Sequence, residues 1–230
     1  MDPKKALRDQ LLDWKSWGVD VAPSRGQVQG KADHGGPPGE GTAARPGLDD
    51  LRIEVAACRQ CGLANTRTRT VFCSGKPSPL MFVGEAPGED EDATGEAFVG
   101  AAGKMLTRVL KDAGISRDQI YIANVLKCRP PGNRPPAPAE VESCAPFLRR
   151  QIELVNPKVI CALGKPAAFS LLGWEGPMRN VRGTWRLIQG RWITATYHPS
   201  YLLRSRGDID TVLGDFKAIL DRLAALGATL

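Results

Sequence analysis

Residues 80–92 read Leu80-Met81-Phe82-Val83-Gly84-Glu85-Ala86-Pro87-Gly88-Glu89-Asp90-Glu91-Asp92. The first four residues are apolar and Gly84 ends the run, which is typical of a short buried strand. A Pro–Gly turn and four carboxylates follow, and a helix is predicted to begin near Ala102. An open α/β sheet binds its ligand where a strand ends in a loop of this kind. The stretch is therefore our candidate site, although most polar loops between a strand and a helix have no chemical role.

Length and composition limit the class of protein. The chain has 230 residues, enough for one domain with a full core. No apolar run approaches the roughly 20 residues that span a bilayer, and the N-terminus lacks the apolar segment of a secretory signal. We therefore expect a cytosolic protein. In that compartment the six cysteines favour metal or redox chemistry over disulfides.

Charge is spread unevenly along the chain. The formal net charge is +6, yet residues 1–50 carry seven Lys/Arg against eight Asp/Glu, and the remainder carries 24 against 17. Basic residues gather at 129–134, 149–150, 179–191 and 204–206. A basic surface of this kind suits a polyanion, of which nucleic acid is the commonest, although excess arginine also serves solubility.

The composition divides the chain into two parts. Lys4–Trp17 places Leu7, Leu11, Leu12 and Trp14 at helical spacings, so we expect a short amphipathic helix there. Gly18–Leu48 is rich in Gly, Pro and Ala and has too few apolar side chains to order itself. The prediction is an N-terminal helix and disordered linker over residues 1–47, and one globular domain over 48–230.

Strand and helix patterns alternate along the globular part. Predicted strands are Leu80–Val83, Gln119–Leu126, Lys158–Leu163 and Arg191–Thr196, the last with a hairpin partner at Thr184–Gln189. Predicted helices are Asp49–Cys58, Ala102–Ala113, Ala139–Val155, Pro166–Leu172 and Ile209–Leu226. The proline-rich stretch Lys127–Pro136 is expected to be neither helix nor strand. This alternation predicts a three-layer α/β/α fold around a central four-stranded, mostly parallel sheet.

Polar residues follow three of the four predicted strands. Glu85 follows the first strand, Asn124 ends the second, and His198 follows the fourth. Because the carboxyl ends of parallel strands meet at one edge of the sheet, we expect these three side chains to surround one crevice.

Four of the cysteines form a candidate metal site. They are Cys58 and Cys61, a C-x2-C pair, with Cys128 and Cys144 further along the chain. The spacing fits either a structural zinc or an iron–sulfur cluster and does not decide between them. Cys161, between Ile160 and Ala162, is interpreted as a small buried hydrophobe, and Cys73 stands alone in a polar loop.

Several short motifs occur in a particular order. They are Gly84-Glu85-Ala86-Pro87-Gly88 with Glu91-Asp92, Phe98-Val99-Gly100 with Gly103, Asn124 with Lys127-Cys128-Arg129-Pro130-Pro131, and His198-Pro199-Ser200-Tyr201-Leu202-Leu203-Arg204. With the four cysteines, they resemble the family-4, iron–sulfur uracil-DNA glycosylases over about residues 51–225. The resemblance implies a sheet between helices and a 4Fe–4S cluster on those cysteines. It also implies a base-excision repair enzyme that flips uracil out of DNA and hydrolyses its N-glycosidic bond, leaving an abasic site.

The resemblance also assigns the uracil pocket. Phe98 stacks on the flipped ring. Asn124 offers a donor and an acceptor that match O4 and N3–H of uracil and mismatch cytosine. Ala86 belongs to the same pocket, at a position where more familiar glycosylase families carry an acid.

The implied chemistry involves four further residues. His198 donates a hydrogen bond to uracil O2 and stabilises the leaving anion. Glu85 and Glu91 are alternatives for the carboxylate that stabilises the sugar cation or orients the attacking water, and Asn133 helps to position that water. There is no lysine in Glu85–Asp92 to form a Schiff base, so we expect a monofunctional glycosylase without strand cleavage.

Contacts with DNA and other partners complete the expectation. Leu202 and Leu203 are predicted to fill the vacated base stack, with Arg204 on a phosphate. The substrate is single- or double-stranded DNA containing uracil, and we expect a monomer in the bacterial or archaeal cytosol or nucleoid. The N-terminal tail is a candidate for contact with a replication clamp.

Two other functions stay open on the sequence. The first is a uracil-DNA binding or trapping protein with little turnover, although the Arg-Arg-Ile-His insertion of related trapping proteins is absent. The second is an electron-transfer protein with the cluster as its functional centre, which leaves the meeting of Glu85, Asn124 and His198 unexplained.

Overall fold

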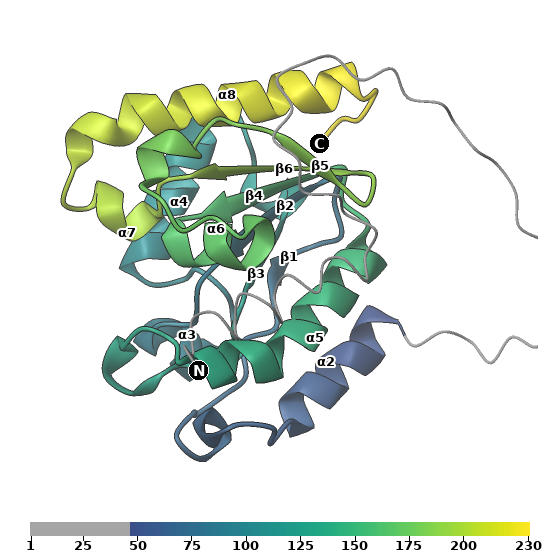
Figure 1. Ribbon diagram of the computed structural model, residues 1–230, viewed down its shortest axis with the longest axis vertical. Helices are drawn as coiled ribbons and strands as arrows, with labels where there is room; N and C mark the ends of the chain where they lie inside the picture. Colours follow the sequence, from purple (N-terminus) through teal and green to yellow (C-terminus); the bar gives the residue numbers. More distant parts are fainter. Residues whose placement is uncertain (1–46) are drawn as a thin grey trace, which may run out of the picture.

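The computed structural model describes residues 47–230 (Figure 1). The helix predicted at Lys4–Trp17 and the linker up to residue 46 lie outside the described residues. Among residues 47–230, no helix is long and apolar enough to cross a membrane.

The described chain forms one six-stranded sheet in the order β1-β3-β2-β4-β6-β5. Its strands are β1 Ser74–Gly75, β2 Leu80–Gly84, β3 Tyr121–Asn124, β4 Val159–Leu163, β5 Arg186–Ile188 and β6 Arg191–Thr196. The central four, β3, β2, β4 and β6, are parallel, as predicted. The edge strands β1 and β5 pair antiparallel with their neighbours. The predicted partner of β6 is confirmed as β5, whereas two-residue β1 was not predicted.

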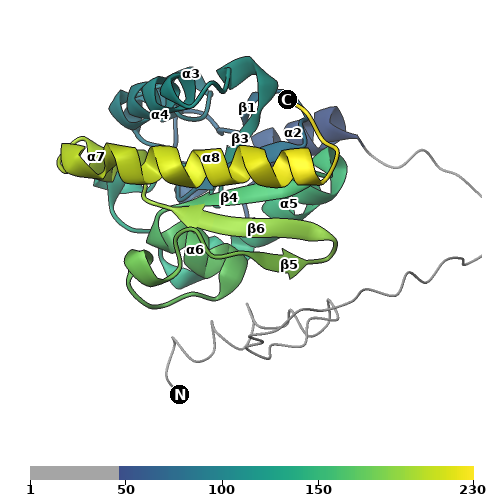
Figure 2. The same cartoon turned by 90° about the horizontal axis from the view of Figure 1, so that it is seen from above.

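Helices cover both faces of this sheet (Figures 1 and 2). They are α2 Leu48–Ala57, α3 Glu89–Thr94, α4 Ala101–Asp112, α5 Pro138–Val155, α6 Lys165–Leu172, α7 Pro199–Leu202 and α8 Ile209–Ala225. Single 3-10 turns lie at Gly62–Asn65, Arg117–Gln119, Pro131–Asn133, Met178–Asn180 and Arg206–Asp208.

The side chains of the buried strands alternate between the two faces of the sheet, and each face has its own hydrophobic core. Met81 and Val83 of β2 face one core, which contains α2, α5 and α6. Leu80 and Phe82 face the other, which contains α4 and α8. Successive side chains of a strand point to opposite faces, so a fully apolar strand feeds both layers. The three-layer prediction is confirmed.

Two short helices were not predicted, and both have a local cause. The acidic stretch after Gly88 is α3 rather than a loop. Its four carboxylates stand in the first turn, where the helix dipole favours negative charge, and Glu91 accepts a capping hydrogen bond from the Gly88 N–H at 3.0 Å. Helix α7 starts at Pro199, a residue suited to the first helical position, behind His198 as its N-cap.

The proline-rich stretch Lys127–Pro136 also departs from the prediction. It contains a 3-10 turn at Pro131–Asn133, in which Gly132 adopts φ 63°. Pro131 stands at the start of this turn, where its missing N–H costs no hydrogen bond. The prediction of no helix there was therefore wrong for three residues.

Candidate active site

A polar cavity of about 500 Å³ lies at the carboxyl ends of the parallel strands. Eight of the predicted site residues line it: Glu85, Ala86, Glu91, Phe98, Asn124, Asn133, His198 and Leu203. They come from the segments that follow β2, β3 and β6, with α3 and α7 at the same edge (Figure 1). The expected meeting of the acidic turn, the amide and the imidazole is confirmed.

Gly84 leaves room for the Phe98 ring and the Asn124 side-chain amide to lie close together. Gly84 of β2 pairs in register with Asn124 of β3. A Cβ added at Gly84 would overlap Asn124 Oδ1 and would lie 2.7 Å from Phe98 Cε2. The Phe98 ring centroid in turn lies 5.7 Å from that of His198, with the planes 40° apart. A side chain at position 84 is therefore incompatible with this wall of the cavity.

Asn124 presents an amide whose oxygen has no protein partner. Its residue is 2% exposed, and Oδ1 is buried without a hydrogen-bond donor from the described residues. Its backbone oxygen accepts from Lys127 Nζ at 2.7 Å, which anchors the end of β3. A buried acceptor without a hydrogen-bond donor costs about 1–3 kcal/mol of stability. A ligand N–H that donates to Asn124 Oδ1 would therefore bind favourably.

The hydrogen bonds of His198 define its tautomer. Its Nδ1 accepts from the Ser200 backbone N–H at 3.1 Å, and Ser200 Oγ lies 2.8 Å from the same atom. A backbone N–H can only donate, so Nδ1 carries the lone pair and the proton of the neutral ring is on Nε2. Burial lowers the pKa of His198 to about 4, against a smaller opposing effect of Glu91. The ring is therefore neutral at pH 7 and keeps one N–H donor.

Ser200 was given no role by the sequence reasoning. The signal for it is the position of a serine two residues after the histidine, which is the spacing of a helix cap. The residue holds the ring rather than contributing a reactive group of its own.

The two predicted carboxylates differ in their bonding. Glu91 Oε1 accepts from the N–H groups of Val99 and Gly100, both at 2.9 Å, and Oε2 accepts from Gly88. Its oxygens therefore join α3 to the start of α4. The side chain of Glu85 makes no hydrogen bond or ion pair with another described residue, and burial raises its pKa. Glu85 is thus the carboxylate that a ligand or water can engage.

The proline-rich segment forms another wall of the cavity. Asn133, at φ 55°, accepts from Arg129 Nε at 2.7 Å. Arg134 also lines the cavity, and its guanidinium pairs with both carboxylate oxygens of Glu140 at 2.9 and 2.6 Å. This pair fastens the segment to the first turn of α5. Sequence reasoning missed it because the partner six residues away is not recognisable without the turn at Pro131–Asn133.

The predicted DNA-contacting residues separate in the structure. Leu202 is 1% exposed and packs in the core shared with α4 and α8, so its prediction as part of a wedge was wrong. Leu203 is 42% exposed and lines the cavity. Arg204 is exposed and lies outside the cavity lining. One turn of α7 sends neighbouring leucines in different directions, which the sequence alone does not resolve.

The four predicted metal ligands line a second cavity, between α2 and α5. They are Cys58, Cys61, Cys128 and Cys144. Arg67 Nη1 donates to Cys128 Sγ at 3.1 Å, and the Lys127 backbone N–H donates to Cys144 Sγ at 3.3 Å. Burial raises the pKa of Cys144 to about 11 and also raises that of Cys128. Donors aimed at sulfur suit bound thiolates, so this donor set fits an iron–sulfur cluster.

The four thiols are spread around the wall of the cavity and do not converge on the position of a single metal ion. Among residues 47–230, no three His, Cys, Asp or Glu side chains are grouped to hold a single metal ion. The remaining cysteines are both buried. Cys161 is fully buried in β4, as predicted. Cys73 lies in the loop before β1, as predicted, but it is 7% exposed and its sulfur accepts from Arg52 Nη2 at 3.6 Å.

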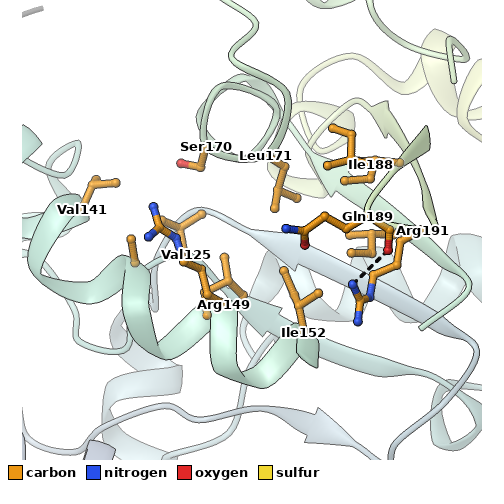
Figure 3. Close-up of a pocket in the computed structure, with 13 residues that line it drawn as sticks. Val125, Val141, Arg149, Ile152, Ser170, Leu171, Ile188, Gln189 and Arg191 are labelled. Carbon is orange, nitrogen blue, oxygen red and sulfur yellow. Dashed lines mark hydrogen bonds between the residues drawn. The ribbon is translucent and has the colours of Figure 1, made fainter. Parts of the chain in front are cut away.

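A third cavity is apolar and lies away from these groups (Figure 3). It is bounded by α5, α6 and the β5–β6 hairpin, and Ile152 and Leu171 are among its lining residues. Arg191 also lines it, and donates to the Gln189 carbonyl at 3.2 Å. None of the fourteen sequence-predicted site residues lines this cavity, so it is not the candidate active site.

Known proteins match most of the chain. Residues 71–224 match the model of the uracil DNA glycosylase superfamily. A type-4 uracil-DNA glycosylase of Archaeoglobus fulgidus is 44% identical over 75% of this chain and 91% of its own length. The type-4 enzyme of Thermotoga maritima is 46% identical over 70% of this chain and 85% of its own. The type-4 enzyme of Sulfurisphaera tokodaii is 42% identical over 75% of this chain and 83% of its own length.

Proposed function

The chain belongs to the uracil-DNA glycosylase superfamily, and we propose that its polar cavity hydrolyses the N-glycosidic bond of a deoxyuridine flipped out of DNA. The activity is that of a monofunctional uracil-DNA glycosylase, as in the similar type-4 proteins. The observation that carries the proposal is the meeting of Glu85, Asn124 and His198 around one cavity.

Base recognition rests on Asn124 and Phe98. Uracil N3–H supplies the donor that Asn124 Oδ1 lacks in the protein, and the amide NH2 donates to O4. Cytosine has an acceptor at N3 and a donor at C4, so it opposes both bonds. Phe98 stacks on the ring, a contact worth about 1–3 kcal/mol in comparable sites. Ala86 completes the pocket with an uncharged wall.

His198 assists departure of the base. As the bond between C1′ and N1 breaks, negative charge develops on the uracil ring and positive charge on the sugar. The neutral imidazole donates its Nε2–H to O2 and stabilises the anion, with its orientation held by Ser200. No proton needs to leave the histidine, which agrees with a pKa of about 4.

Glu85 is the carboxylate that acts on water. Its raised pKa makes it a stronger base, and its side chain is not engaged by another described residue. Water adds its oxygen to C1′ and gives one proton to the carboxylate, and the uracil anion takes a proton from solvent. Asn133 helps to orient the water. Glu91 acts as a positioning residue, since all its hydrogen bonds hold backbone N–H groups.

The DNA is held at the rim of the cavity. Leu203 fills the space that the flipped base leaves, and Arg204 contacts a phosphate. Both single- and double-stranded DNA are substrates, and the enzyme acts as a monomer at the nucleoid of a bacterium or archaeon. The N-terminal tail, residues 1–47, is the proposed segment for contact with a replication clamp.

A 4Fe–4S cluster on Cys58, Cys61, Cys128 and Cys144 is the proposed cofactor. When bound, it supplies no reacting group but links the segment before β2 to the segment after β3. Support comes from four thiols around one cavity and from the type-4 relatives.

One assay tests the proposed function. A labelled oligonucleotide with a single uracil, single- or double-stranded, is incubated with the protein, and free base and abasic sites are measured. We expect both to form with turnover, and a thymine oligonucleotide to remain intact. Absence of base release at stoichiometric enzyme would overturn the proposal, and a heat-stable protein–DNA band would indicate trapping instead.

A further inference from the structure

A second hollow, of about 330 Å³, adjoins the active cavity. The two share His198, which separates them. The side chains that give this hollow its character are Lys165, Arg179, Tyr197 and Tyr201. It has been given no role so far.

The two cationic side chains that line this hollow, those of Lys165 and Arg179, have no partner among the described residues. Neither the Lys165 ammonium nor the Arg179 guanidinium makes a hydrogen bond or ion pair with another described residue, and both residues are exposed. Arginines around the active cavity behave differently, because Arg129 pairs with Glu89 and Arg134 with Glu140. No carboxylate lines the hollow. Two free cations beside a hollow without acids suit a phosphate.

The aromatic side chains offer a surface for a base. The rings of Tyr197 and Tyr201 lie 5.0 Å apart between centroids, at 37°. Tyr201 is 36% exposed, and its hydroxyl donates to Asp208 Oδ2 at 2.8 Å, which holds the ring in place. A fixed, exposed aromatic ring costs little entropy when a base stacks on it.

Charge decides on which side the DNA backbone passes. The active cavity is lined by four carboxylates, those of Glu85, Glu89, Asp90 and Glu91, and by one cation, Arg134, which is paired with Glu140. A phosphate is therefore disfavoured on that side. The hollow on the other side of His198 carries positive charge instead.

We propose that this hollow binds the nucleotide adjoining the flipped deoxyuridine, with its phosphate between Lys165 and Arg179 and its base against Tyr201. This subsite rests on the proposed glycosylase function and adds to it a recognition site for the neighbouring nucleotide.

The first test removes the cations. The double variant K165A/R179A should raise KM on a single-stranded uracil oligonucleotide about tenfold and leave kcat within about twofold. Its slope of log KM against log salt concentration should fall by about 0.7, which corresponds to one phosphate that is no longer neutralised on a single strand. The matched control is K76A/K158A, which removes two exposed positive charges before β2 and β4, at the opposite edge of the sheet from Lys165. KM and salt slope equal to those of the control would overturn the proposal.

The second test addresses stacking. Y201A should raise KM about tenfold, as loss of one base–aromatic stack predicts. Y201F keeps the ring and loses only the bond to Asp208, so its KM should rise by much less than that of Y201A. Equal effects of the two substitutions would contradict the stacking role.

Shortened substrates separate this proposal from the glycosylase assignment. Oligonucleotides are prepared with the uridine at the 5′ end, at the 3′ end or internal. The unmodified protein and K165A/R179A should differ on the internal uridine and on one terminal form, and agree on the form that lacks the neighbour in the hollow. A difference of equal size on all three would sink the subsite. Failure of the unmodified protein on all three would sink the proposed function itself.

Discussion

At the scale of single residues, Asn124 illustrates how the backbone directs a recognition group. It is the last residue of β3, its neighbour in register is Gly84, and its carbonyl is tied to the buried ammonium of Lys127. The amide therefore enters the cavity from a fixed point. Lys127 is fully buried, and burial lowers its pKa to about 8.

Replacing Asn124 by aspartate should abolish the match to uracil. The carboxylate cannot donate to O4 and repels it, so kcat/KM on uracil should fall by about 100-fold or more, roughly 3 kcal/mol. Excision of cytosine should become detectable at long times. Release of each base from matched oligonucleotides measures this, with N180D on an exposed turn as the control. Unchanged activity of N124D on uracil would exclude the readout role.

His198 should make stability depend on pH in a defined window. The pKa of His198 is about 4 in the folded protein and 6.5 when unperturbed. As pH falls, the unfolded chain therefore binds the proton at a higher pH than the folded protein does. The free energy of unfolding should therefore fall as pH decreases from about 6.5 to about 4, by about 3 kcal/mol from this residue. Above pH 6.5 the residue has no such effect.

Denaturant titration at pH 7 and pH 4.5 measures the change, and H198N provides the reference. The difference between the two proteins isolates this residue, since the carboxylates are common to both. Excision by the unmodified protein should also decline at acid pH, because the Glu85 carboxylate, whose pKa burial raises, is then protonated and cannot accept a proton from water. An identical pH dependence in H198N and the unmodified protein would disprove the assignment.

At the scale of elements, the contact of α4 with the Phe98 segment fixes the stacking ring. A Cβ added at Gly103 of α4 would overlap the Phe98 carbonyl and lie 2.8 Å from Phe98 Cα. Phe98 has φ 57°, so its backbone is already held in a conformation unusual for a bulky residue. The helix cannot shift without moving the ring.

Alanine at position 103 should therefore destabilise the protein by about 1–3 kcal/mol and reduce excision. Alanine at Gly214, inside α8 with open space around its Cα, should instead stabilise by up to about 1 kcal/mol. The two substitutions are chemically the same, so opposite signs in a denaturant titration confirm the role of close packing. Equal stabilisation by both would contradict it.

The four cysteines for which we propose a cluster, Cys58, Cys61, Cys128 and Cys144, line one cavity between α2 and α5. Replacement of Cys128 by serine should lower iron content and the melting temperature, by about 10 °C, and affect the chemical step less. Iron and sulfide analysis with calorimetry measures this. C161A, at a buried position outside the ligand set, should keep its iron. A C128S protein with full iron and full stability would exclude it as a ligand.

At the scale of the whole molecule, residues 47–230 contain both the polar cavity and the cavity lined by the four cysteines, and the family model matches 71–224. We propose that this part is the complete catalytic domain. A chain beginning at Gly47 should fold and excise uracil at a rate within about twofold of the full chain. Circular dichroism and the base-release assay measure this, and a loss above about tenfold would show that residues 1–46 take part.

The sequence predicted those features that depend on long apolar patterns. The parallel strands β2, β3 and β4 were found because each contains a continuous apolar run, and β6 was found from its aromatic and β-branched residues. The convergence of Glu85, Asn124 and His198 followed from strand direction. Short elements were missed, because two residues of β1 or one turn of α7 carry no periodicity. The capping of α3 by Glu91 was missed because its acidic residues resemble those of a loop.

Partners distant in sequence could not be predicted. Nothing near Leu202 distinguishes it from Leu203, since only the fold decides which one faces α8. The same holds for the contacts that occupy Glu91, whose acceptance of two N–H groups from Val99 and Gly100 separates its role from that of Glu85. The sequence motif identified both Glu85 and Glu91 as candidates. Only their hydrogen bonds indicate which of the two carboxylates is free to act on water.

The unpaired amide oxygen of Asn124 has a consequence for turnover. Free uracil carries the same N3–H as the nucleotide, so the released product satisfies this acceptor as well as the substrate does. The proposed recognition by Asn124 therefore predicts product inhibition by the base, and the repair rate should slow as uracil accumulates around the enzyme.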